Sequence, residues 1–146
     1  MKLYTIGFTK KSAEEFFNTL RKNNIERLVD IRLHPGGQLS GFAKQDDLPY
    51  FLSHLTDGCQ YTYLPQLAPA KEILDDYHAD ADWPRYTERF ERLMDERDIP
   101  SCLNQANFEA YISCLLCSEA SPEKCHRRLV AERLATYWSN LEIIHL

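Results

Sequence analysis

The chain has 146 residues, enough for one hydrophobic core, and we expect residues 1–146 to form a single domain. Its 22 acidic side chains outnumber the 17 basic ones, and the net charge of −5 argues against a broad surface for nucleic-acid phosphates, although a local basic site stays open. The longest apolar run is too short to cross a membrane, and the first residues lack the apolar core of a secretory signal, so we expect a cytoplasmic protein without membrane contact.

The first part of the chain predicts a strand, a helix and a second strand. Lys2–Gly7 is rich in residues that favour strands. Ser12 and Glu15 have the spacing of a capping box, and the helix that they start should end near Asn23. A second strand-like run covers Arg27–Leu33, so this order predicts a βαβ unit.

The rest of the chain continues the alternation of strands and helices. The predicted elements are a short helix with Asp46 or Asp47 as its N-cap, a strand at Tyr61–Leu64, helices at Glu72–Tyr77 and Pro84–Arg97, a strand ending at Cys117, a helix to about Asn140 and a strand at Leu141–Leu146. Ser121 and Pro122 are favoured at the N-cap and at the first position of a helix, so the last helix should begin there. The pattern predicts the α/β class, with an open, mainly parallel sheet and helices on both faces, as in three-layer Rossmann-like domains.

Sheets of this class bind ligands beyond the carboxyl ends of their strands. Several polar or small residues lie at the predicted ends: Thr5, Gly7, Asp30, Arg32, Cys117 and Glu119. Asp30 and Arg32 are two positions apart on a strand, so they should point to the same side. We therefore expect a ligand site at this edge of the sheet.

The cysteines divide into two groups. Their odd count, five, predicts free thiols, and Cys59, Cys102 and Cys114 are interpreted as small apolar residues. Cys117 and Cys125 lie near the predicted helix start, where helix N–H groups and His126 can lower a thiol pKa. Such a thiol beside a histidine is a nucleophile with its base, and the alternative is a buried, inert thiol.

Two further alternatives use the same residues. A metal site of Cys117, Cys125 and His126, with Glu119 as fourth ligand, has suitable donors, but adjacent residues on a helix point apart, and the sequence does not favour it. A reversible disulfide between Cys117 and Cys125 is the other alternative.

The apolar stripe of the last predicted helix, extended backward by one turn, reaches His126 and Arg127. A buried charge is costly without a partner. Asp30 or Glu119 could supply it in a structural ion pair, or Arg127 could bind the phosphate or carboxylate of a ligand. Both interpretations stay open.

Four ordered patches resemble one known family. They are Thr5-Ile6-Gly7, Val29-Asp30-Ile31-Arg32-x-x-Pro35, Tyr63-Leu64-Pro65-x-Leu67 and Cys117-x-Glu119-x-x-Pro122-x-x-Cys125-His126-Arg127. Together they resemble the bacterial and archaeal family called domain of unknown function 488. The resemblance implies a compact α/β domain and no particular activity.

The chain departs from that family's pattern at two places. The family usually has a His after Thr-Ile-Gly, where this chain has Phe8, and paired glycines where it has Ala68 and Pro69. If that His took part in chemistry, this chain has lost or altered it.

These observations favour a small enzyme-like domain that binds a small anionic ligand of the nucleotide or phosphate type. The candidate catalytic residues are Cys117 as nucleophile, His126 as proton carrier and Glu119 as acid or base. The candidate ligand-binding residues are Thr5, Gly7, Asp30, Arg32, Cys125 and Arg127. The alternative is a non-catalytic module that binds a nucleotide, nucleic acid or a partner protein. The sequence identifies neither a cofactor nor an oligomeric state.

Overall fold

The computed structural model describes residues 1–146, apart from the side chain of Gln38. Strands and helices alternate along most of the chain. The elements are β1 (Lys2–Gly7), α1 (Ala13–Lys22), β2 (Arg27–Asp30), α2 (Leu48–Leu55), β3 (Gln60–Tyr63), α3 (Lys71–Asp80), α4 (Trp83–Glu96), α5 (Gln105–Ala110), β4 (Ser113–Cys117), α6 (His126–Tyr137) and β5 (Glu142–His145), with short 3-10 segments at Gln38–Ala43 and Pro65–Leu67.

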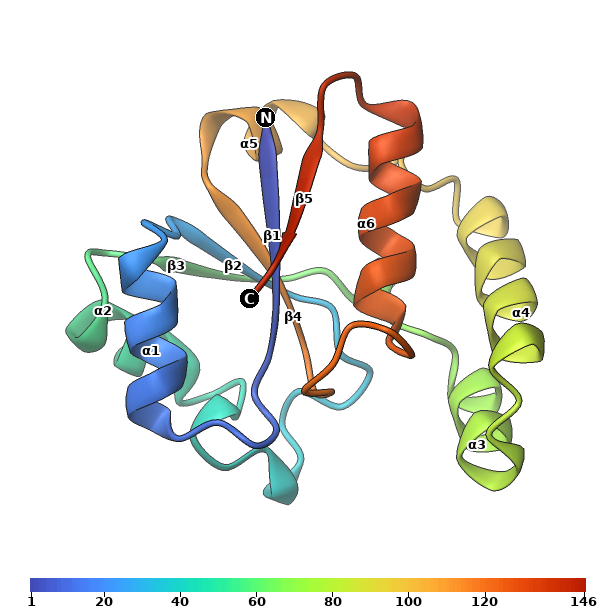
Figure 1. Ribbon diagram of the computed structural model, residues 1–146, viewed down its shortest axis with the longest axis horizontal. Coiled ribbons are helices and arrows are strands. Elements are labelled where there is room, and N and C mark those ends of the chain that lie inside the picture. The colour runs from blue at the N-terminus through green and yellow to red at the C-terminus, as the bar shows by residue number, and fades with distance from the viewer.

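The five strands form one sheet in the order β3-β2-β4-β1-β5, and every neighbouring pair is parallel. Figure 1 shows α1 and α2 on one side of the sheet and α6, α4 and α3 on the other. The predicted open α/β architecture with helices on both faces is therefore confirmed. None of the described helices combines the length and the apolar character that crossing a membrane requires.

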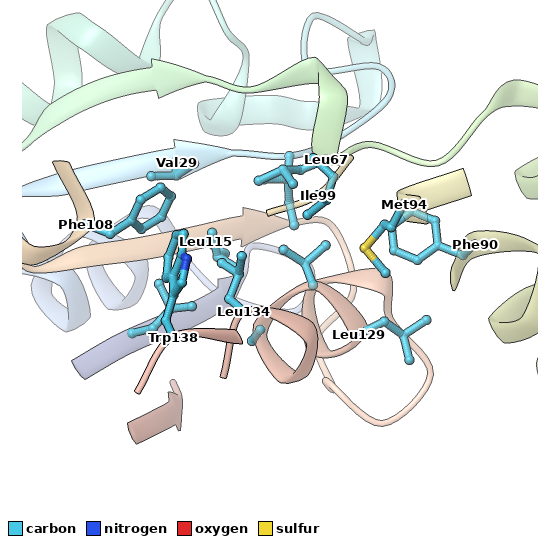
Figure 2. Packing of buried hydrophobic residues seen from close by; sticks show 14 of the residues in the cluster. Val29, Leu67, Phe90, Met94, Ile99, Phe108, Leu115, Leu129, Leu134 and Trp138 are labelled. Atoms are coloured by element: carbon cyan, nitrogen blue, oxygen red, sulfur yellow. The ribbon is translucent and has the colours of Figure 1, made fainter. Parts of the chain in front are cut away.

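Two apolar layers pack against the two faces of the sheet. Leu115 of the central strand β4 faces α6, and Figure 2 shows it among Leu134, Trp138 and Phe108. The next residue, Leu116, faces the opposite layer with Phe16 and other residues of α1. Because β4 is buried along its whole length, its last residue, Cys117, lies in a largely water-excluded environment.

The start of α1 matches its prediction. The Ser12 side chain accepts a hydrogen bond from the Glu15 N–H at 3.1 Å, and the Glu15 carboxylate accepts from the Ser12 N–H at 2.8 Å. This capping box satisfies two donors that the helix leaves unpaired, and α1 ends with Asn23 as its C-cap.

The start of α6 differs from its prediction. The helix begins at His126 with Cys125 as N-cap, rather than at Pro122 with Ser121 as N-cap. The Ser121 hydroxyl accepts a hydrogen bond from the Glu123 N–H at 3.3 Å, and the Cys125 N–H donates to the Pro122 carbonyl at 3.3 Å. These local bonds hold residues 121–124 in turns, because a serine side chain can bond to nearby backbone in place of capping a helix.

Two other elements also differ. β2 ends at Asp30 and not at Leu33. Helix α5 was not predicted, because a six-residue helix carries too little periodicity to be recognised. Its only buried residue is Phe108, whose ring packs 5.0 Å from that of Trp138 at the end of α6.

Candidate active site

Cys117 and His126 meet at the carboxyl edge of the sheet. Cys117 is the last residue of β4, and His126 is the first residue of α6, so the loop 118–124 carries the chain from one to the other. The Cys117 Sγ lies 3.4 Å from His126 Nδ1, and only 5 % of Cys117 is exposed. The predicted thiol and its predicted base are thus in direct contact.

The other ring nitrogen of His126 determines the tautomer. Nε2 lies 2.8 Å from the carbonyl oxygen of Ile31, which can only accept a hydrogen bond, so Nε2 carries a proton. In the neutral ring Nδ1 is therefore the free base, and it is the nitrogen that faces Cys117. The ring edge also packs against Phe90, with the centroids 5.6 Å apart, which holds the imidazole in place.

Several groups stabilise a thiolate at Cys117. The Cys125 thiol, as its hydrogen-bond partner, makes the largest contribution to a lowered pKa of Cys117. The main-chain N–H groups of Ser118 and Glu119 and the charge of Arg127 act in the same direction, whereas burial opposes them. The pKa of Cys117 lies below its ordinary value, which favours a nucleophile.

Cys125 faces the same point as Cys117 because it precedes the helix. Its backbone is extended, with φ of −136° and ψ of 137°, and 2 % of the residue is exposed. The prediction that Cys125 and His126 point apart assumed that both were helical, and it is wrong: the donor atoms of Cys117, Cys125 and His126 all lie within 4.8 Å of one another. The hydrogen bond to Cys117, together with burial, raises the pKa of Cys125.

Three such donors could hold a soft metal ion. Glu119, the fourth ligand considered in the sequence, has its carboxylate in an exposed position. The Arg127 guanidinium lies with Nη1 3.6 Å from the Cys125 Sγ, so its positive charge opposes a divalent cation at this point.

Arg127 is completely buried and does not form the ion pair that was one of its two interpretations. Nη1 donates to the main-chain carbonyl of Glu119, and Nη2 donates to the carbonyl of Ala120 at 3.3 Å. Among the described side chains, Arg127 has no ion pair with a carboxylate, and its buried Nε has no hydrogen-bond acceptor. Of the two interpretations, the ion pair with Asp30 or Glu119 is therefore wrong, because loop carbonyls take the place of those carboxylates.

Asp30 and Arg32 form a second cluster. The Arg32 Nε and Nη2 donate to the two oxygens of Asp30 at 2.9 and 2.6 Å, and Nη2 also donates to the Ala43 carbonyl at 2.7 Å. The two side chains thus point to the same side, as predicted, although the strand ends at Asp30. The Arg32 Nη1 is a buried donor without an acceptor among the described residues.

The two clusters lie on opposite faces of the sheet. Asp30 is paired in register with Leu116, and paired residues of parallel strands point to the same face, whereas the next residue, Cys117, points to the other. The sequence pattern predicted that all of these residues belong to one site. The structure brings together Cys117, Cys125, His126 and Arg127, and it places Asp30 and Arg32 behind the sheet, joined to them through the main chain of Ile31.

The remaining predicted residues have structural contacts. The Thr5 hydroxyl lies 2.7 Å from Nδ1 of His145 on β5, and Gly7 packs against the main chain of Glu119. Phe8 packs over Arg32, with the guanidinium carbon 5.3 Å from the ring centroid. The residue at the position of the family's His therefore lies over the Asp30–Arg32 pair.

Two tyrosines were not recognised in the sequence as members of the Asp30–Arg32 cluster. Tyr61 donates from Oη to Asp30 at 2.7 Å, and Tyr63 donates to the Arg32 carbonyl at 3.2 Å. Outside the two clusters, Cys102, which was interpreted from the sequence as a small apolar residue, is exposed. Tyr61 and Tyr63 are two positions apart on a strand, so their spacing places both on the same face. The sequence does not contain the order of the strands, which sets this face beside Asp30.

The comparisons support one assignment. The family described as domain of unknown function DUF488 matches residues 12–134, a range that includes the Cys117–Arg127 motif and excludes the Thr5-Ile6-Gly7 patch. Comparison with the curated proteins and with the solved structures found no match. Since the match covers most of the sequence, the chain belongs to the family of domain of unknown function DUF488.

Proposed function

We propose that this domain is a thiol-dependent enzyme in which Cys117 attacks a small anionic substrate of the phosphate type. The observation that carries the proposal is the 3.4 Å contact between the Cys117 Sγ and His126 Nδ1. The bond from Nε2 to the Ile31 carbonyl leaves Nδ1 as the base on the side of the thiol. A positioned nucleophile with its base, whose orientation is held by a third group, is the common arrangement in covalent catalysis.

An anionic substrate is supported by the charge of Arg127. A buried guanidinium needs a negative partner, and its described acceptors are neutral: the carbonyls of Glu119 and Ala120 and the sulfur of Cys125. The thiolate of Cys117 or a ligand anion would supply the missing charge. The start of α6 adds the positive end of a twelve-residue helix dipole.

The reaction would follow from these positions. His126 Nδ1 takes the proton of Cys117, and the thiolate attacks the phosphorus atom while the bond to the leaving oxygen breaks. Arg127 and the N–H groups of Ser118 and Glu119 would stabilise negative charge near the sulfur. The protonated His126 returns its proton to the leaving oxygen, and water then hydrolyses the thiophosphate and regenerates the thiol. We assign proton transfer to His126, because the Glu119 carboxylate is exposed.

Two alkylating reagents of different charge test the proposal. Iodoacetamide is neutral and iodoacetate is an anion, and both react with thiolates. We expect the ratio of iodoacetate to iodoacetamide rates to be higher at Cys117 than at glutathione. Inorganic phosphate should slow the reaction at Cys117 and not at the exposed Cys102. Peptide mass spectrometry measures each site separately.

A matched pair of variants tests whether Arg127 causes the preference of Cys117 for iodoacetate over iodoacetamide. Arg127→Met should remove it, whereas Arg128→Met should keep it, because Arg128 lies over the Trp83 ring, 5.9 Å from its centroid. If Cys117 reacts no faster than Cys102, the enzyme proposal is wrong. If Cys117 reacts quickly but shows no preference for iodoacetate, Cys117 is a nucleophile and the proposal of an anionic substrate is wrong.

The non-catalytic binding module is an outcome of the same experiment. In that case phosphate would still raise the melting temperature after Cys117 is replaced by Ser, while the wild-type thiol would show no enhanced alkylation. A purely structural cluster would show neither effect.

A further inference from the structure

Two thiols share one base in the buried cluster. The sulfurs of Cys117 and Cys125 and the His126 Nδ1 lie within 4.8 Å of one another, and both cysteines are free. A disulfide needs the sulfurs about 2 Å apart. Cys117 ends a strand, and Cys125 follows the turns of residues 121–124, so closing a disulfide requires a rotation of these side chains or a shift of the loop between them.

We propose that Cys117 and Cys125 form a redox-active dithiol, in which Cys117 reduces a small hydroperoxide and Cys125 then closes a disulfide with it. The proposal rests on the nucleophilic Cys117 of the proposed function and goes beyond it, because it gives a role to the second thiol and adds a second class of substrate.

The first step consumes the hydroperoxide. The Cys117 thiolate attacks the outer oxygen, a sulfur–oxygen bond forms and the oxygen–oxygen bond breaks. The leaving alkoxide or hydroxide takes the proton that His126 Nδ1 had received from the thiol. Cys117 becomes a sulfenic acid, oxidised by two electrons, and the peroxide is reduced to an alcohol or to water.

The second step uses Cys125. Its sulfur attacks the Cys117 sulfur, the disulfide bond forms, and the sulfur–oxygen bond breaks. The departing hydroxide takes the Cys125 proton through His126 and leaves as water. Arg127 Nη1, 3.6 Å from the Cys125 Sγ, stabilises negative charge on that sulfur as it attacks. A small dithiol from solution returns the disulfide to two thiols by exchange, and is itself oxidised to a disulfide.

Burial restricts the oxidant to a small one. Cys117 is 5 % exposed and Cys125 is 2 % exposed. Hydrogen peroxide is close to water in size, so it can reach a sulfur that a protein disulfide cannot reach. The same burial protects the sulfenic acid from bulky thiols in solution, which leaves Cys125 as the nearest partner.

Cys59 and Cys114 provide a comparison within the chain. Both are buried free thiols in the apolar layer on the opposite face of the sheet. Burial raises the pKa of Cys59 to about 12 and that of Cys114 well above its ordinary value. Their described hydrogen bonds go to the carbonyls of Gln60 and Leu115, with no imidazole beside them. They should stay reduced while Cys117 is oxidised.

The experiment treats the reduced full chain with one equivalent of hydrogen peroxide and follows intact mass and tryptic peptides. Trypsin cleaves after Arg97 and after Lys124, so a Cys117–Cys125 bridge joins the tripeptide 125–127 to the peptide 98–124. Fragmentation within the second peptide distinguishes Cys117 from Cys102 and Cys114. We expect the mass of the wild type to decrease by two hydrogens. The mass of Cys125→Ser should increase by one oxygen at Cys117, and dimedone should trap this sulfenic acid. Cys114→Ser, the control, should behave as the wild type.

The outcomes separate this inference from the proposed function. Suppose that Cys117 is alkylated quickly, but that peroxide yields equal amounts of sulfinic acid in the wild type and in Cys125→Ser and forms no bridge. The dithiol proposal is then wrong, while the proposal that Cys117 is a nucleophile is retained. If Cys117 neither alkylates quickly nor reacts with peroxide before Cys102, both proposals are wrong. The wild-type peptide map decides between these results even if a variant fails to fold.

Discussion

Gly7 lies so close to Glu119 that a Cβ atom on residue 7 would stand 1.7 Å from the Glu119 carbonyl oxygen. The same atom would lie 2.9 Å from Nη1 of Arg127, which donates to that oxygen. Gly7 is also paired in register with Cys117. The absence of a side chain at residue 7 therefore allows the loop after Cys117 to fold back over β1 and to receive Arg127.

The first prediction concerns Gly7→Ala. The methyl group would meet backbone and not a flexible side chain, so the loop must move, at a cost of about 1–3 kcal/mol in the free energy of unfolding. The N–H groups of Ser118 and Glu119 would move with it, and alkylation of Cys117 should slow. Denaturant unfolding and iodoacetamide kinetics measure the two effects. Gly36→Ala is the control, because a Cβ atom there has no neighbour within 4 Å. Equal stability of the two variants would contradict the prediction.

The second prediction concerns the buried pair of Asp30 and Arg32. Asp30→Asn leaves the Arg32 cation buried without its carboxylate, which should lower the free energy of unfolding by about 3–5 kcal/mol. The double variant Asp30→Asn, Arg32→Met should recover part of the loss, because it removes the unpaired charge. Asp76→Asn serves as the control, since its pairs with Arg85 and Arg89 lie at the surface, partly exposed to solvent, and should contribute less than the fully buried pair. A double variant less stable than Asp30→Asn would contradict this account.

The third prediction is a pH dependence. Because the pKa of Cys117 is lowered, the rate of its alkylation should reach its midpoint at a lower pH than that of glutathione. Cys125→Ala removes the contribution that lowers this pKa most, so the midpoint should move to higher pH. Rates of iodoacetamide reaction across the alkaline range measure both midpoints. A midpoint unchanged in Cys125→Ala would show that the hydrogen bond between the thiols does not stabilise the thiolate.

The fourth prediction separates the two bonds of His126. His126→Gln can still donate to the Ile31 carbonyl but cannot take a proton, whereas His126→Leu does neither. Both should slow alkylation of Cys117 at neutral pH. Only His126→Leu should also lose about 1–3 kcal/mol of stability through the unpaired buried carbonyl.

The control for this fourth prediction is His145→Gln. His145, the last residue of β5, bonds to Thr5 and forms no hydrogen bond with Cys117 among the described side chains, so Cys117 should react as in the wild type. If His126→Gln alkylates as fast as the wild type, His126 is not the base for Cys117.

Local patterns in the sequence were sufficient to predict the fold class and most of the elements. The capping box of Ser12 and Glu15 marked the start of α1, and the apolar stripe of α6 correctly placed His126 and Arg127 on its buried side. The spacing of Asp30 and Arg32 predicted that they point to one side, and the Cys117–Arg127 motif identified the family.

Which of these residues come into contact depends on how the strands and helices pack in three dimensions. The order of the strands and the alternation along β4 put Asp30 and Cys117 on opposite faces, and neither is encoded in local spacing. Because residues 121–124 form turns, α6 begins at His126 and Cys125 is its N-cap, with an extended backbone. As a result, the sulfurs of Cys117 and Cys125 both lie close to the His126 imidazole. Arg127 donates hydrogen bonds to loop carbonyls and not to a carboxylate, because the absence of a side chain at Gly7 allows the main chain of Glu119 to approach β1. Contacts between residues far apart in the chain depend on packing, and a linear pattern does not contain that information.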